Sequence, residues 1–270
     1  KATMGRADFG NLNPDSLPPN DAIVFVEAGL DVDTFRVESD GLTRLACLYL
    51  SPKIDSSKEI KGTVFLLHED GSDRNAVLPL ARCLVDSGFV VVAYDQRASG
   101  RSTGKYRGEG GYEANDLNEV ISYLDLRDRI VHPVIVLGFS LGADAGILAA
   151  QDEKRIDGVV AVNPYLSTTN LLDKLKKQHN MFWFPFFRTT MWWWYNIRSS
   201  YAAPYRKISD IEPVACQTLL LVSPDGIAKA EVQQLKELSS HELLEIKPKP
   251  DSEEKLLSLI FQFATGMQLR

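Results

Sequence analysis

Short apolar runs separated by segments of helical periodicity are the feature that most constrains the fold of this chain. From residue 62 onward, such runs cover residues 63–67, 89–94, 134–138, 158–162, 218–222 and 243–246. Continuous apolar runs are typical of strands buried on both faces of a parallel sheet, where crossover helices cover each face. The sequence therefore predicts an α/β domain with a mostly parallel central sheet.

The intervals between these runs predict the helices. We expect helices over residues 72–87, 112–127, 140–150, 229–239 and 252–264. The second contains Leu117, Val120, Ile121 and Leu124, an i, i+3, i+4, i+7 stripe that suits packing on a sheet. Asp251 with Glu254 three residues later predicts Asp251 as the N-cap of the last helix.

Three segments lie outside this alternation. Residues 1–20 are rich in Asn, Pro and Gly, which predicts an extended N-terminal arm before a domain over residues 21–270. Residues 22–50 read as short strands with an Asp40-Gly41 turn, which predicts an antiparallel hairpin at the start of the sheet. Residues 165–212 are far longer than a plain crossover, so we expect a short cap insertion there.

The segment from Val134 to Ala143 carries the chemistry. It reads as a strand, then Gly138-Phe139-Ser140-Leu141-Gly142, then a helix, which is the G-x-S-x-G nucleophile elbow in its proper context. Such a tight turn strains the serine backbone and exposes its hydroxyl. It also places Ser140 at a helix N-terminus, where the amide of Leu141 can stabilise an oxyanion.

With these residues, the chain resembles the α/β-hydrolase superfamily, in particular its esterase, lysophospholipase and serine-aminopeptidase-like branches. Residues 95–102, Asp-Gln-Arg-Ala-Ser-Gly-Arg-Ser, look like the D-x-R-G-x-G-x-S loop of that superfamily, with Ala98 at a usual glycine. His68-Glu69-Asp70-Gly71 is similar to its H-G-x-G segment. The resemblance implies an α/β-hydrolase fold with helices on both faces of the sheet, and a serine nucleophile.

The resemblance also implies positions for the rest of the machinery. The Glu69-Asp70 region would supply the second half of the oxyanion hole, although a carboxylate that points inward would repel the oxyanion, so either the hole is reshaped or Glu69 turns outward. Asp225, in the loop after the strand that follows the insertion, is in the position of the triad acid, or else belongs to an ordinary Asp-Gly turn.

The expected histidine is missing. The loop before the last helix reads Lys247-Pro248-Lys249-Pro250-Asp251-Ser252, and the chain has only four histidines. His132 and His241 precede strands and so fall at the wrong edge of the sheet. His68 and His179 remain as candidate bases, with His68 alternatively anchoring its loop, and Lys247 or Lys249 as a base is a further reading.

Composition limits the partners. With 36 acidic and 30 basic residues, the net charge is −6, which disfavours nucleic acid and anionic membranes. No P-loop or G-x-G-x-x-G spacing occurs, and we expect no cofactor and no metal. No signal segment or spanning helix is evident, but the chain begins with Lys1, so localisation stays open between the cytoplasm and export after removal of an upstream segment.

The predicted cap suggests what binds. Residues 181–195 hold all four tryptophans and a single charge, a density that is either buried against the domain, lines an apolar pocket above Ser140, or contacts a membrane or partner. Two functions follow. One is a serine hydrolase acting on an ester, thioester or small amide with an apolar acyl group; the other is a degenerate pseudo-hydrolase that binds a small apolar ligand or a protein through the cap.

Overall fold

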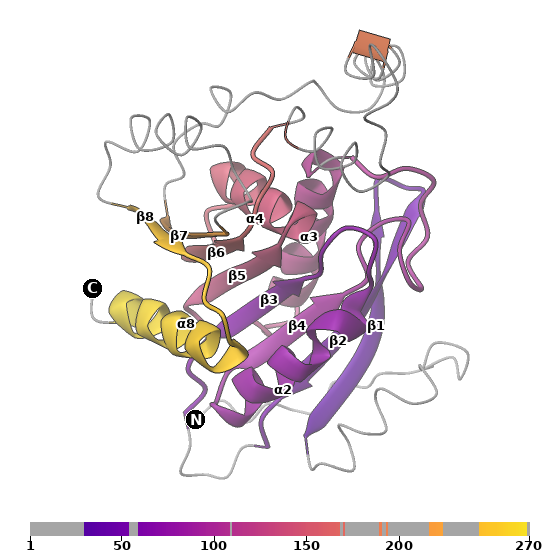
Figure 1. Ribbon diagram of the computed structural model, residues 1–270. Coiled ribbons are helices and arrows are strands. Elements are labelled where there is room, and N and C mark those ends of the chain that lie inside the picture. The colour runs from indigo at the N-terminus through magenta and orange to yellow at the C-terminus, as the bar shows by residue number, and fades with distance from the viewer. Residues whose placement is uncertain are drawn as a thin grey trace.

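A single sheet organises the part of the chain that the computed structural model describes, residues 30–53, 59–108, 110–167, 170, 189–190, 193, 216–223 and 243–268. Its eight strands lie in the order β1-β2-β4-β3-β5-β6-β7-β8 (Figure 1). The strands are β1 (Asp31–Ser39), β2 (Thr43–Ser51), β3 (Thr63–Leu67), β4 (Val90–Tyr94), β5 (Val134–Phe139), β6 (Gly158–Val162), β7 (Gln217–Val222) and β8 (Leu244–Pro248).

The sheet begins antiparallel and continues parallel, as the sequence predicts. β1 and β2 form a hairpin in which Ser39 pairs with Thr43, and β2 pairs antiparallel with β4. The turn works because Asp40 adopts a φ of 50° and accepts the Thr43 amide at 3.0 Å through its carboxylate. All pairings from β4 through β3, β5, β6 and β7 to β8 are parallel.

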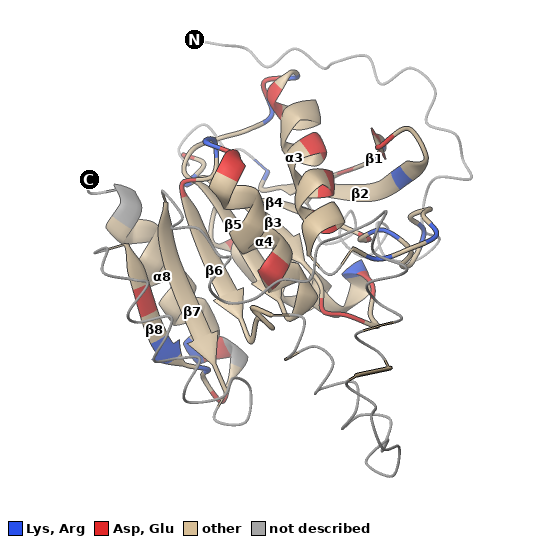
Figure 2. Cartoon of the chain, turned by 90° about the horizontal axis from the view of Figure 1, so that it is seen from above, with Lys and Arg blue, Asp and Glu red and all other residues tan. Residues whose placement is uncertain are grey.

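Helices cover both faces of the sheet. α2 (Leu78–Asp86) and α8 (Glu253–Gln268) pack on one face, whereas α3 (Gly111–Asp125) and α4 (Leu141–Asp152) pack on the other. Because side chains alternate along a strand, successive residues of β3 enter opposite layers of the core. The central strands β3, β4, β5 and β6 carry no charged residue, and the charges lie on helices, loops and the outer strands (Figure 2).

The predicted helices that fall within the described residues are found with two corrections. Residues 72–87 do not form one α-helix: a 3-10 turn, η2 (Arg74–Val77), precedes α2, which begins just before Pro79, a residue favoured in the first helical turn. The N-cap of α8 is Ser252 rather than Asp251, because α8 begins at Glu253 and the Ser252 hydroxyl accepts the Lys255 amide at 3.4 Å. The apolar stripe of α3 is fully buried.

Some predictions fall where the structure is not described. The arm over 1–20, the helix over 229–239 and most of the cap over 165–212 are among these residues. Within the described part of the cap, the side chain of Trp193 is exposed. Among the described helices, none is both long and apolar enough to cross a membrane.

Candidate active site

A strained turn connects β5 to α4 and places Ser140 between them. Ser140 has a φ of 55° and a ψ of −115°, and α4 begins at the next residue. A positive φ is costly for a residue with a Cβ and persists only where surrounding contacts enforce it. The amide of Ser140 donates to the Val162 carbonyl at the end of β6, at 2.9 Å, which fixes the turn at the carboxyl edge of the sheet.

Two glycines make this turn sterically possible. A Cβ on Gly138 would overlap the backbone of Gly142, and a Cβ on Gly142 would lie 2.7 Å from the His68 carbonyl oxygen. Real Cβ atoms essentially never approach backbone atoms this closely, so larger residues would separate α4 from the segment after β3. The G-x-S-x-G pattern therefore has a direct packing cause, and the predicted strained backbone turn is present. The expectation that Ser140 is exposed is wrong, because the residue is buried, with 5% of its surface accessible.

The same contact brings the two predicted halves of the oxyanion hole together. Leu67 of β3 pairs with Gly138 of β5, so the segment that follows β3 runs past the N-terminus of α4. This is also where the chain order reverses, since β4 lies on one side of β3 and β5 on the other, and such switch points form ligand crevices in open α/β sheets. As the first helical residue, Leu141 has an amide with no acceptor inside its own helix.

The segment after β3 forms a tight turn with its charges directed away from the helix or paired. The Ser72 amide donates to the Glu69 carbonyl at 3.3 Å, and Gly71 has a φ of 78°. Glu69 is exposed, in line with the outward orientation considered from the sequence. Asp70 forms an ion pair with Arg107 from the loop before α3.

His68 anchors this segment to the loop after β4. Its Nε2 accepts the Gln96 amide at 3.0 Å, so in the neutral ring the proton is on Nδ1, which donates to the Glu69 carbonyl at 2.8 Å. The Gln96 side chain in turn donates to the His68 carbonyl at 2.5 Å. Burial lowers the pKa of His68 against the opposing effect of the Glu69 carbonyl. Both ring nitrogens are engaged in loop contacts, which fits the anchoring role better than that of a base.

The loop after β4 is held by a buried carboxylate. Asp95 accepts the amides of Arg74 and Arg101, each at 2.9 Å, and a Cβ on Gly100 would overlap its side chain. Ala98 has a φ of 54°, a left-handed conformation that explains why glycine is usual in the motif it resembles. The chain therefore retains the loop shape at the cost of backbone strain at Ala98.

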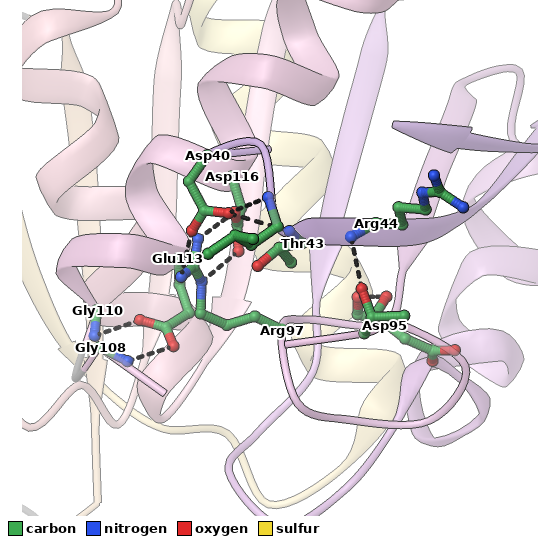
Figure 3. A network of polar contacts seen from close by, with 12 residues as sticks. Asp40, Thr43, Arg44, Asp95, Arg97, Gly108, Gly110, Glu113 and Asp116 are labelled. Atoms are coloured by element: carbon green, nitrogen blue, oxygen red, sulfur yellow. Dashed lines mark hydrogen bonds and ion pairs between the residues drawn. The ribbon is translucent and has the colours of Figure 1, made fainter. Parts of the chain in front are cut away.

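A second buried network links this loop to α3 and the hairpin. Arg97 donates two hydrogen bonds to Asp116, at 2.8 and 2.6 Å, and a third to Asp40 at 3.0 Å (Figure 3). The Glu113 carboxylate accepts the amides of Gly108 and Gly110, at 2.8 and 2.9 Å. Burial raises the pKa of Glu113, and these amides oppose that effect. Removing one partner of such a network would leave an uncompensated buried charge.

The segment after β6 also lies against the first turn of α4. Asp144 in the first turn of α4 is buried and accepts the amides of Tyr165 and Leu166, at 2.9 and 2.8 Å. The ring of Tyr165 packs against Leu141. Sequence reasoning missed Asp144, although an acidic residue in the first helical turn after an elbow is a signal that could have been used.

The remaining candidates divide into those outside the described residues and those whose contacts the structure gives. Asp225, His179 and His241 fall among residues whose structure is not described. His132 precedes β5 and contacts Asp157 at 2.6 Å before β6, at the edge opposite to Ser140, as the sequence predicts. The loop between β8 and α8 contains no histidine; Lys247 pairs with Glu245 at 2.8 Å, and Lys249 is exposed. Within the described residues, no group of His, Cys, Asp and Glu is arranged to hold a metal.

Comparison with known proteins decides the family. The family described as "Serine aminopeptidase, S33" matches residues 58–211, more than half of the chain and all of the elbow. The chain belongs to this hydrolase family. An uncharacterized protein of Escherichia coli, YcjY, is 29% identical over 121 residues, which is 44% of this chain and 40% of that protein. The match thus spans less than half of this curated relative.

Solved structures agree with the S33 family in fold. The esterase Pf2001 of Pyrococcus furiosus matches with a TM-score of 0.71 and 21% identity over 92% of this chain and 95% of its own. An esterase of Exiguobacterium antarcticum matches with a TM-score of 0.62 and 15% identity over 86% of this chain and 100% of its own. The a/b serine hydrolase XC6422 of Xanthomonas campestris matches with a TM-score of 0.56 and 16% identity over 88% of this chain and 92% of its own. These likenesses confirm the predicted α/β-hydrolase fold.

The strain at Ser140 predicts that glycine is more stabilising than alanine at this position, the reverse of their order within a helix. We expect Ser140→Gly to have a free energy of unfolding about 1 kcal/mol larger than that of Ser140→Ala, because both lack the hydroxyl and only glycine relieves the positive φ. Ser258, an exposed position within α8, is the matched control, where glycine should be about 1 kcal/mol less stable than alanine. Chemical denaturation measures both differences. The same sign at both positions would contradict a strained elbow.

The buried neutral ring of His68 predicts a loss of stability in mild acid. Its pKa is lower folded than unfolded, so as the pH falls below about 6.5 the unfolded chain binds the proton first. The contribution of neutral His68 to the free energy of unfolding is therefore complete above that pH. It declines as the pH falls, until the ring in the folded protein is itself protonated. His68→Gln should flatten this part of the pH profile of unfolding, and nitrogen NMR should find the Nδ1–H tautomer. A ring that titrates at its ordinary pKa would oppose this account.

Proposed function

We propose that this S33-family chain is a serine hydrolase that acts on an ester, thioester or small amide with an apolar acyl group, with Ser140 as the nucleophile. The observation that carries the proposal is the backbone of Ser140, held at a φ of 55° between β5 and the first residue of α4. Such strain is maintained where a turn must present a side chain at a defined point.

In this mechanism, the Ser140 hydroxyl attacks the substrate carbonyl and its proton passes to a base. The negative charge that forms on the carbonyl oxygen is stabilised by the Leu141 amide and by the segment at Glu69 and Asp70. Collapse of the tetrahedral intermediate expels the leaving group with that proton, and water then releases the acyl group. Asp225 as the acid and His179 as the base complete the proposed set.

His179 is the preferred base because of how the other histidines are used. His68 is engaged at both ring nitrogens, and His132 contacts Asp157 at the opposite edge of the sheet. His179 belongs to the predicted cap segment, in which it follows Tyr165, a residue that packs on Leu141, and precedes the aromatic run over 181–195. A base supplied from a cap is consistent with the loop between β8 and α8, which lacks histidine.

The second candidate is the pseudo-hydrolase that binds an apolar ligand or a protein through the cap. The specific observation in its favour is that Lys249, Pro250, Asp251 and Ser252 occupy the loop where the fold normally provides the histidine. An imidazole normally activates the serine by accepting its proton, and loss of a triad member costs several orders of magnitude in rate.

Covalent labelling distinguishes the two candidates. If Ser140 is an activated nucleophile, a fluorophosphonate should add one phosphonyl group per chain, intact mass should detect it, and Ser140→Ala should abolish it. His179→Ala should slow labelling by about 10³-fold or more, whereas His132→Ala should not. Hydrolysis of p-nitrophenyl esters should exceed that of the Ser140→Ala protein.

The opposite result is equally defined. Absence of both labelling and ester hydrolysis above the Ser140→Ala background, with an apolar ligand bound equally by both proteins, would reject the hydrolase and support the pseudo-hydrolase. Normal labelling of His179→Ala would support the serine hydrolase proposal but show that His179 is not its base.

A further inference from the structure

The Gly-rich loop before α3 reaches across the site to the segment after β3. The Arg107 guanidinium forms an ion pair with Asp70 through Nη1 and donates to the Ser99 hydroxyl at 3.0 Å through Nη2. Asp70 and Arg107 are 37 residues apart in sequence, and both side chains are about one-third exposed. One side chain thus joins the turn after β3 to the loop after β4.

The position of Asp70 makes this contact chemically significant. The carbonyl of His68, two residues earlier, lies against Gly142 in the first turn of α4, so Asp70 is carried by the turn that borders the elbow. An unpaired carboxylate at this point would oppose the negative charge that develops on a substrate oxygen. Glu69 is exposed, and Asp70 is neutralised by Arg107.

Arg107 is itself held from the opposite side by a buried group. The Glu113 carboxylate, fully buried in α3, accepts the amides of Gly108 and Gly110, directly beyond Arg107. A Cβ on Gly108 would overlap the ring of Tyr112, which packs on Arg97. These contacts connect α3, through the backbone beside Arg107 and the Arg107 side chain, to Asp70.

We infer that Arg107 is a positioning residue for the oxyanion segment: it neutralises Asp70 and ties the turn at residues 69–72 to the loop after β4. This inference rests on the proposed function, which makes that turn part of the oxyanion hole. Arg107 does not touch the reacting atoms in this account; it acts through Asp70. The Gly-rich loop before α3 thus contributes to the site through Arg107.

The kinetic test uses the rate of fluorophosphonate labelling at Ser140. We expect Arg107→Ala to lower the second-order rate constant about tenfold or more, because the oxyanion segment is displaced and Asp70 is unpaired. Arg107→Lys should retain most of the rate, and adding Asp70→Asn to Arg107→Ala should recover the part of the loss that the unpaired charge causes. Arg82→Ala, which removes a similarly exposed pair with Asp86 on α2, is the matched control and should leave the rate unchanged.

A second readout does not depend on chemistry at Ser140. Hydrogen exchange at residues 69–72 should accelerate about tenfold or more in Arg107→Ala and stay unchanged in Arg82→Ala, with melting temperatures of all variants within about 2 °C because exposed ion pairs contribute little to stability. Unchanged exchange at this turn, an unchanged labelling rate in Arg107→Ala, or failure of Asp70→Asn to restore it would overturn the inference. If wild-type Ser140 is not labelled while hydrogen exchange responds as expected, the proposed function fails, but the role of Arg107 in holding the turn at residues 69–72 stands.

Discussion

The close approach of two backbone segments around the elbow is the constraint on which the rest of the structure depends. Gly138, Gly142 and the His68 carbonyl occupy a space that admits no additional carbon atom, and Ser140 accepts a positive φ as a consequence. Such strain is stable only if the sheet beneath is rigid. Uncharged strands with residues fully buried on both faces provide that rigidity.

Buried carboxylates organise the loops above this sheet. Asp95, Glu113 and Asp144 each accept two backbone amides, and each thereby fixes a loop that borders the site. The two amide donors stabilise the buried negative charge. The carboxylate in turn accepts hydrogen bonds from loop amides that have no backbone acceptor. Several acidic residues of this acidic chain are thus structural parts of the site and not a surface for cationic partners.

The sequence was sufficient wherever the information was local. Apolar runs and the stripe of Leu117 and Leu124 predict strands and a helix face because periodicity reports burial directly. The elbow could be predicted because the residues that meet its steric requirement, 138–142, are consecutive in the sequence. The pairing of Asp70 with Arg107, or of Arg97 with Asp116, depends on loops brought together by the fold, and no local pattern reports it. The boundary error at α8 concerns capping, where the neighbouring Asp251 and Ser252 both offer an oxygen to the first amides of the helix. The error at α2 has another cause, the 3-10 turn that precedes the helix.

The central claim is that the turn at Ser140 presents a nucleophile beside the Leu141 amide. A crystal structure of the protein after treatment with a fluorophosphonate tests it most directly. We expect a phosphorus atom bonded to the Ser140 Oγ, a positive φ retained at Ser140, and a phosphonyl oxygen about 3 Å from the Leu141 nitrogen. A phosphonyl oxygen directed away from Leu141, or crystals in which Ser140 carries no adduct, would contradict it.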